Sequence, residues 1–377
     1  MLLLEVKARD FRNLVEQGVT LARHTTVLFG ANGQGKTNFL EACYLLCSLR
    51  PLRARKLAEL VRIGSERSAL VAGKFDLPSG VREVEVEIGR EGRTARVDGK
   101  PVRDPDELFG GLATVAFTPD DLAVVKGGPE GRRRLLDRAV QNRHPAHLAD
   151  ARDYQRALRS RNEILRQGAD PALLASFDEP LARLGARLRT RREEILEEIQ
   201  PGAQSAFAEI ARGEPPLLAT YLAAGRDSDD LAGGGGASLE TRLLEALRRR
   251  LPRDRERGYT SVGPHADDLG LSLGERAARL YASQGQSRAV VLALKIGEIE
   301  NLRRAQGRPP LLLLDDVSSE LDPERNAWLM QYLAALEGQV VLTTTDLKLV
   351  AKSAVKEALF QRVAGGRIAP ENPLFSE

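Results

Sequence analysis

The segment with the clearest chemical signature is "GANGQGKT", which spans Gly30–Thr37. It fits the pattern G-x-x-x-x-G-K-[ST] of loops that bind nucleotide phosphates, and it lies between a predicted strand and a predicted helix. Glycines let the backbone approach the phosphates closely. Lys36 would supply a positive charge to the outer phosphates, and Thr37 would offer its hydroxyl to Mg²⁺. The sequence therefore predicts a site for ATP and Mg²⁺ that is formed by Gly30, Ala31, Asn32, Gly33, Gln34, Gly35, Lys36 and Thr37.

Two adjacent carboxylates follow the apolar run Leu311–Leu314. A carboxylate at the end of a buried strand suits Mg²⁺, so we expect Asp315 to hold the metal through its water shell, beside Thr37. We expect Asp316 to polarise the attacking water, which makes Asp316 and Lys36 the predicted catalytic residues. The alternative is that Asp316 is a second structural carboxylate or a helix N-cap.

A second candidate phosphate site lies in "YASQGQSR", which begins at Tyr281 and precedes a long predicted helix. Ser283, Gly285 and Gln286 would form the helix start, where backbone N–H groups and the helix dipole favour an anion. Two phosphate sites in one chain make sense if each copy lends Ser283–Gln286 to the nucleotide of a second copy. We therefore expect a two-fold symmetric, head-to-tail homodimer with ATP held between its subunits.

Strand and helix patterns place these motifs in an α/β fold. "LLLEVKARDF" and "TTVLFG" are predicted strands, and "RTARVDGKPV" carries the hairpin turn signal Asp98-Gly99. We expect an α/β domain in two parts, residues 1–118 and 259–377, with an antiparallel β lobe at about 65–105. Residues 119–258 would be a helical insertion that contains a polar, glycine-rich loop, "RDSDDLAGGGGAS".

Composition gives weaker indications. The 377 residues carry a net charge of only +3, but residues 131–200 hold fifteen Arg and no Lys against eleven Asp plus Glu. These arginines are either a solvated helix face or a DNA contact, with Arg132–Arg134 as candidates. Cys43 and Cys47 share a helix face and are predicted to be buried as small apolar side chains. No apolar stretch is long enough to span a bilayer, and no signal-peptide pattern is present, so we expect a cytosolic protein without membrane contact.

The order of the motifs resembles that of ABC-type ATPase heads, and the whole chain resembles the RecF family of bacterial recombination mediators, which are relatives of the SMC proteins. The matching stretches are "FRNL" at Phe11–Leu14, "GANGQGKTNFLEA", "AFTPDDLAVVKGGPEGRRRLLD", "SVGPHADDL", "YASQGQSRAVVLALKIGE" and "LLLLDDVSSELD". The resemblance implies an SMC-like head with an added helical domain. It also implies ATP-dependent dimerisation on single-stranded, duplex, gapped or junction DNA, and slow DNA-stimulated ATP hydrolysis. The implied role is recombinational repair and replication-gap processing, with RecR as a partner in recombinase loading and with support of the SOS response.

The resemblance also assigns residues. Ser283, Gly285 and Gln286 would contact the partner's nucleotide, and Ser319–Asp322 would cross the dimer seam. Arg12 and Asn13 lie where SMC-like heads touch the nucleotide, although Arg12 is open to interpretation as a surface charge.

Several positions depart from the ABC pattern. Asp316 stands in place of a glutamate, and its shorter side chain would slow turnover. Ala266 stands where an arginine is expected, and His265 is interpreted as structural. Thr345 occupies the place of the switch histidine of transporters, and "FTPDDL" stands in place of a lid glutamine.

Two other function classes remain as alternatives. The ATPase subunit of an ABC transporter would carry the switch histidine, the lid glutamine and a shorter insertion, and this sequence has none of them. A small-molecule P-loop kinase would leave Ser283–Gln286 and Ser319–Asp322 without a role.

Overall fold

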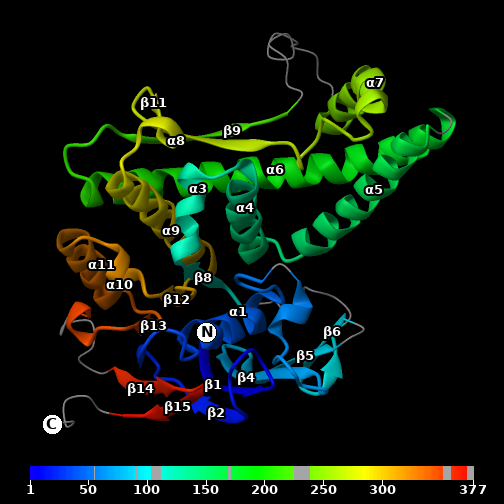
Figure 1. Ribbon diagram of the computed structural model, residues 1–377. Coiled ribbons are helices and arrows are strands. Elements are labelled where there is room, and N and C mark those ends of the chain that lie inside the picture. The colour runs from blue at the N-terminus through cyan, green and yellow to red at the C-terminus, as the bar shows by residue number, and fades with distance from the viewer. Residues whose placement is uncertain are drawn as a thin grey trace.

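The computed structural model describes residues 1–54, 56–89, 92–102, 112–168, 171–224, 238–350 and 358–371. An α/β part lies below a mainly helical part (Figure 1). The predicted glycine-rich loop spans residues 226–238, and all of it except Ser238 falls in the gap 225–237, so that prediction lies outside the described residues.

A six-stranded sheet forms the centre of the α/β part, in the order β15-β14-β3-β13-β12-β8. Five of its strands run parallel, and the edge strand β15 pairs antiparallel with β14. The strands are β3 (Thr25–Phe29), β8 (Thr114–Phe117), β12 (Leu311–Asp315), β13 (Val340–Thr344), β14 (Leu359–Ala364) and β15 (Arg367–Pro370). Strands β12 and β13 are buried along their whole length, as continuous apolar runs in parallel sheets usually are. Because parallel strands end at the same edge, β3 and β12 bring Gly30 and Asp315 to one side of the sheet.

A second sheet is antiparallel and has the order β2-β1-β4-β5-β6-β7. Its strands are β1 (Leu2–Arg9), β2 (Gln17–Thr20), β4 (Ala69–Leu77), β5 (Gly80–Gly89), β6 (Gly92–Val97) and β7 (Lys100–Pro101). The predicted turn at Asp98-Gly99 is confirmed: both residues have positive φ, and Val97 pairs with Lys100. Helix α1 (Lys36–Ser48) shares a core with this sheet, and Cys43 and Cys47 are buried there as free thiols, as predicted.

Helices dominate the upper part. They are η2 (Pro119–Leu122), α3 (Ala123–Lys126), α4 (Pro129–Arg143), α5 (His147–Gln167), α6 (Pro171–Ile210), α7 (Leu239–Arg257), α8 (Ala278–Tyr281) and α9 (Gln284–Gln306). The longest helix that the structure describes, α6, runs for 40 residues and continues through Pro180 and Pro201. Helix α6 crosses α9 closely at Gly297, where an added Cβ would lie 2.7 Å from the carbonyl oxygen of Ile199.

One feature of the upper part is a three-stranded antiparallel sheet in the order β11-β10-β9. Strand β9 (Leu217–Leu222) lies within the region predicted to be helical, and it pairs with β10 (Asp268–Leu273), next to the short β11 (Arg276–Ala277). Residues 268–273, which we assigned to the second ATPase segment, therefore join the upper sheet. The domain boundaries as a whole stay a prediction.

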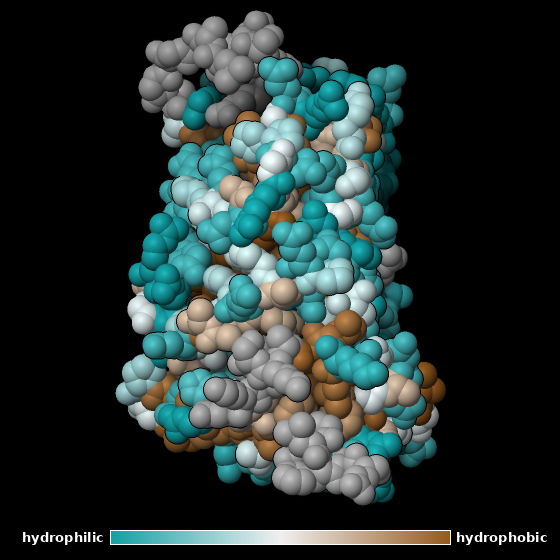
Figure 2. Space-filling model, turned by 90° about the vertical axis from the view of Figure 1, so that its left-hand side faces the viewer, coloured by the Kyte–Doolittle hydropathy of each residue, from teal (hydrophilic) through white to brown (hydrophobic). Residues whose placement is uncertain are grey.

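The remaining short elements are η1 (Leu57–Leu60), α10 (Val317–Glu320), α11 (Pro323–Ala335) and η4 (Leu347–Leu349). On the face seen in Figure 2, hydrophilic side chains cover most of the helical part, and the larger hydrophobic areas lie lower, over the α/β part. Within the described ranges, every helix is too short or too polar to cross a lipid bilayer.

Candidate functional site

The loop between β3 and α1 has the backbone that phosphate binding requires. Gly30, Gly33 and Gly35 all have positive φ, which favours glycine. At Gly30 an added Cβ would also lie 2.3 Å from the carbonyl oxygen of Val363. The Lys36 ammonium donates to the carbonyl oxygens of Gly30 (2.6 Å) and Ala31 (2.9 Å), so it spans the loop. Burial lowers the pKa of Lys36, while Asp316 and Asp315 act in the opposite direction.

Thr37 and Asp315 meet beside this loop, although they are far apart in the sequence. The Thr37 hydroxyl donates to Asp315 Oδ1 at 2.7 Å, and the Thr343 hydroxyl donates to the same oxygen at 3.1 Å. Asp315 is almost fully buried, and burial raises its pKa against these two hydrogen bonds. An adjacent hydroxyl and carboxylate are the hard oxygen ligands that Mg²⁺ takes when most of its other ligands are water and phosphate. These residues therefore fit the predicted metal.

Asp316 occupies an unusual position. It precedes α10 at the N-cap, but its side chain caps no N–H group, and its φ is 51°, in the left-handed region. Its Oδ1 is buried and makes no hydrogen bond to any residue that the structure describes. A backbone in the left-handed region and a buried carboxylate oxygen without a hydrogen bond are typical of functional residues. The arrangement disfavours the alternative interpretation of Asp316 as a helix cap.

Arg12 and Asn13 lie next to the loop, and each is held there by hydrogen bonds to different residues. Arg12 donates to Glu41 Oε2 through Nε (2.9 Å) and Nη2 (2.8 Å), and Glu41 is only 1% exposed. Arg12 is therefore a partly buried ion-pair partner, and the interpretation as a simple surface charge is wrong. Asn13 donates to the carbonyl oxygen of Gly33 at 3.3 Å, and it accepts from Asn38 at 2.7 Å.

Two residues of this network were missed from the sequence. Glu41 also accepts hydrogen bonds from the backbone N–H groups of Arg53 and Ala54. The Arg53 guanidinium in turn lies 3.7 Å from Asp315 and 3.1 Å from Asp120. A glutamate one turn after Thr37 on a strongly apolar helix was the available signal for Glu41.

The second predicted phosphate site opens α9. Ser283 is exposed and forms a capping box with Gln286: its hydroxyl accepts from Gln286 N (3.1 Å), and Gln286 Oε1 accepts from Ser283 N (2.7 Å). Gln286 Nε2 also donates to Glu214 at 2.6 Å. This segment lies beside α8 in the upper part, whereas α1 begins in the lower part (Figure 1). One chain thus presents its two candidate phosphate sites in different places.

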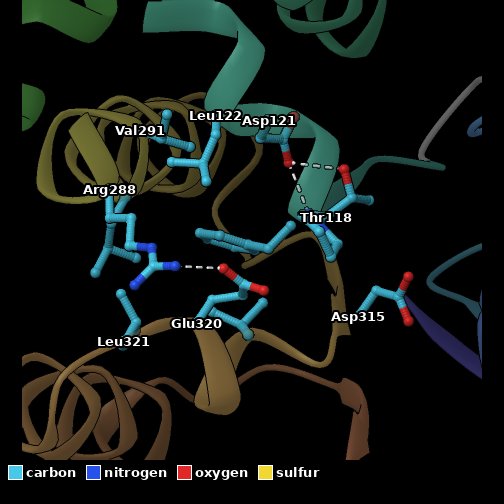
Figure 3. A pocket seen from close by; sticks show the side chains of 12 residues that line it. Thr118, Asp121, Leu122, Arg288, Val291, Asp315, Glu320 and Leu321 are labelled. Carbon is cyan, nitrogen blue, oxygen red and sulfur yellow. Dashed lines mark hydrogen bonds and ion pairs between the residues drawn. The ribbon is translucent and has the colours of Figure 1, made fainter. Parts of the chain in front are cut away.

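Residues 319–322 contact the start of α9. The Arg325 side chain donates to Asp322 at 2.7 Å, and an added Cβ at Gly285 would lie 2.7 Å from its Nη1. Arg288 pairs with Glu320 at 2.7 Å across a small pocket of about 50 Å³ (Figure 3). Apolar side chains from η2, α9 and α10 line this pocket, and Asp315 lies at its far end (Figure 3). A displacement of α9 would therefore change these contacts and shift residues 319–322.

The candidate DNA contacts Arg132–Arg134 need correction. Arg132 is buried and forms a two-pronged ion pair with Asp268 (2.6 and 2.9 Å), so it is structural. Arg133 donates to the carbonyl oxygen of Asp267 at 2.8 Å. Only Arg134 keeps a side chain that is more than half exposed.

Other arginines of the same region are buried in ion pairs as well. Arg161, Arg189 and Arg192 pair with aspartates, so neither a solvated face nor a DNA contact describes them. His265 is structural, as interpreted from the sequence: its ring nitrogens contact the Tyr154 hydroxyl (2.6 Å) and the Thr260 carbonyl oxygen (2.9 Å). The departures Ala266 and Thr345 are both exposed.

Comparisons with known proteins agree with this architecture. Residues 2–365 match the family model described as the RecF/RecN/SMC N terminal domain. A DNA replication and repair protein RecF of Anaeromyxobacter sp. (strain Fw109-5) is 55% identical over 372 residues, which cover 98% of this chain and 99% of the relative. The protein of that name from Myxococcus xanthus (strain DK1622) is 53% identical over 371 residues, with 98% and 97% covered.

Comparison with solved structures also identifies RecF and SMC proteins as similar. The recombination mediator protein RecF-ATP in the RecFOR pathway superposes with a TM-score of 0.86 at 30% identity, and 98% of each chain is covered. An Smc head bound to the C-winged helix domain of ScpA gives a TM-score of 0.54 at 14% identity over 98% of this chain and 97% of the other, which shows the shared fold alone.

Proposed function

This chain belongs to the RecF/RecN/SMC N-terminal domain family and within it to the RecF proteins, and we propose that it is an ATP-driven, head-to-tail dimer that acts on DNA in repair. The relatives are named DNA replication and repair proteins, and one solved neighbour is RecF with ATP. This identity excludes the transporter alternative. The family likeness supports a weak ATPase of the SMC and ABC type.

The observation that carries the dimer proposal is the separation of the two phosphate sites. Lys36 and Thr37 begin α1 at the sheet edge, whereas the exposed Ser283 caps the start of α9, which lies next to α8 in the upper part (Figure 1). A second copy in the opposite orientation would bring its Ser283, Gly285 and Gln286 to the γ-phosphate held by the first loop. Since ADP has no γ-phosphate, only ATP would join the two subunits.

Each residue at the loop would have a distinct role. Lys36 would leave its contacts with the Gly30 and Ala31 carbonyl oxygens and neutralise the outer phosphates. Thr37 and Asp315 would hold Mg²⁺, which when bound screens the charge of the phosphates. Asp316 would accept a hydrogen bond from the attacking water and orient it toward the γ-phosphate.

The partners follow from the family. We infer that the dimer binds single-stranded, duplex, gapped or junction DNA, and that it acts with RecR in loading recombinase and in supporting the SOS response. The same inference places it in the cytoplasm.

Sedimentation of the purified chain tests the dimer proposal. ATP should convert monomer into dimer, and ADP should not. Ser283→Arg should stay monomeric while still binding ATP. Ser238→Arg is the matched control, because Ser238 also caps a helix through its hydroxyl, at α7, and should dimerise normally. The proposal would be refuted if the unaltered chain stayed monomeric with both ATP and ADP, or if Ser283→Arg formed dimers with ATP.

A further inference from the structure

A groove of about 470 Å³ lies between α4 and the segment that follows α1. Its charged lining consists of the carboxylate Glu130 and the arginines Arg50, Arg53, Arg134 and Arg138. The groove shares Arg50, Glu130 and Arg134 with a hollow of about 460 Å³ toward α5. Helix α4 forms one wall of the groove and stands above α1, and α5, which lines the neighbouring hollow, lies beside α4 (Figure 1). The groove therefore presents an excess of positive charge along an open surface.

Helix α4 carries three charged side chains along the face that lines the groove. Glu130, Arg134 and Arg138 are each four residues apart and lie on one face of the helix. Arg134 pairs with Glu130 of its own helix, and 54% of its side chain is exposed. Arg138 lies over the ring of Tyr44, 5.5 Å from the centroid, and donates to the carbonyl oxygen of Leu52 at 2.9 Å. Arg138 is thus held in place by the protein, whereas Arg134 faces solvent.

Arg50 is a partly buried cation at the groove. Within the described part of the chain, its guanidinium makes no hydrogen bond or ion pair. Burial lowers the pKa of Arg50. The nearby Asp137 and Tyr44 act to raise it, and Arg138 lowers it further. Burial and the neighbouring Arg50 likewise lower the pKa of Arg93 on β6. Crowded guanidinium groups repel each other, and an anion between them would relieve that repulsion.

The aromatic side chains at the groove limit what the anion can be. Tyr44 is covered by Arg138, and Tyr154 is buried, so neither ring can stack on a base. Binding of single strands commonly uses such stacking, whereas binding of duplex DNA can rest on backbone phosphates alone. We propose that this groove binds the phosphate backbone of duplex DNA without reading its bases. The proposal rests on the DNA binding inferred above and assigns it to a surface.

Salt-dependent binding of a fluorescent duplex in the presence of ATP tests the assignment. Log affinity falls as log salt rises, and Arg134→Gln should reduce the steepness of this fall by about 1. The double variant Arg50→Gln/Arg134→Gln should reduce it by about 2. At fixed moderate salt, we expect the double variant to bind on the order of tenfold more weakly. Arg166→Gln is the matched control, because Arg166 is an exposed helix arginine paired with Glu163 outside the groove, and it should behave like the unaltered chain.

The outcomes separate this proposal from the proposed function. If the unaltered chain fails to bind duplex at low salt, the proposed function is wrong. If it binds and both groove variants keep the same slope, the groove assignment is wrong. A variant effect confined to single strands would contradict the duplex assignment. Competition by pyrophosphate as strong as by duplex, at equal phosphate concentration, would make this a site for free phosphates and overturn the proposal. Sedimentation with ATP checks that the variants still fold and dimerise.

Discussion

Asp316→Asn should abolish most ATP hydrolysis and leave the fold at least as stable. The Asp316 Oδ1 is buried without a partner among the described residues, and its φ of 51° lies in the left-handed region. Asparagine adopts that region as readily as aspartate does, and the substitution removes the charge of a carboxylate whose Oδ1 makes no hydrogen bond to a described residue. An unpartnered buried polar group costs about 1–3 kcal/mol, so part of that cost should be recovered. The loss of a group that orients and polarises water should lower turnover by about 10²–10⁴-fold.

Two assays on the same samples separate these effects. Single-turnover hydrolysis of ATP measures the chemical step, and urea unfolding measures the free energy of unfolding. Asp268→Asn is the control, since Asp268 is a paired carboxylate that accepts two hydrogen bonds from Arg132. It should show the opposite pattern, with unchanged hydrolysis and a loss of about 1.5–3 kcal/mol in stability. Normal turnover of Asp316→Asn, or a loss of stability like that of the control, would refute the role of Asp316.

Three further predictions concern other parts of the molecule. Lys36→Met should weaken ATP binding itself, measured by equilibrium titration with a fluorescent ATP analogue, and unchanged affinity would contradict the loop assignment. Arg161→Met should lower the free energy of unfolding in urea by about 3–5 kcal/mol, because it leaves the buried carboxylates of Asp178 and Asp254 without their ion-pair partner. A change below about 1 kcal/mol, which is typical of an exposed ion pair, would contradict this. Burial lowers the pKa of His147 and His265 below the usual 6.5, so the unfolded chain takes up protons first and stability should fall as the pH drops below about 6.5. His265→Asn should flatten this dependence in thermal unfolding, and an unchanged profile would argue against it.

The nucleotide loop and the strand that carries Asp315 were predictable because their signals are local. A glycine pattern between a strand and a helix specifies the loop, and four leucines before a carboxylate specify a buried strand end. Their meeting at one sheet edge follows from parallel strand direction alone. The start of α9 was predictable for the same reason, since Ser283 and Gln286 form a capping box within one turn.

What escaped prediction depends on contacts between distant residues. The pairing of β9 with β10 joins residues 217 and 273, and no local pattern reveals it. A run of three arginines gives no sign that Arg132 turns inward to Asp268 while Arg134 stays outside. Helix α6 continues through Pro180 and Pro201 because packing against α5 and α9 outweighs the local cost of proline.

Each ATP in the proposed dimer is enclosed by the loop of one subunit and the α9 start of the other. Mixing the Lys36→Met chain with the Ser283→Arg chain tests it most directly, because the mixed dimer holds one intact composite site and one doubly altered site. ATP hydrolysis should be nearly absent in each variant alone and should appear on mixing, as one working site per mixed dimer. Activity of the mixture that equals the sum of the two separate samples would contradict the claim.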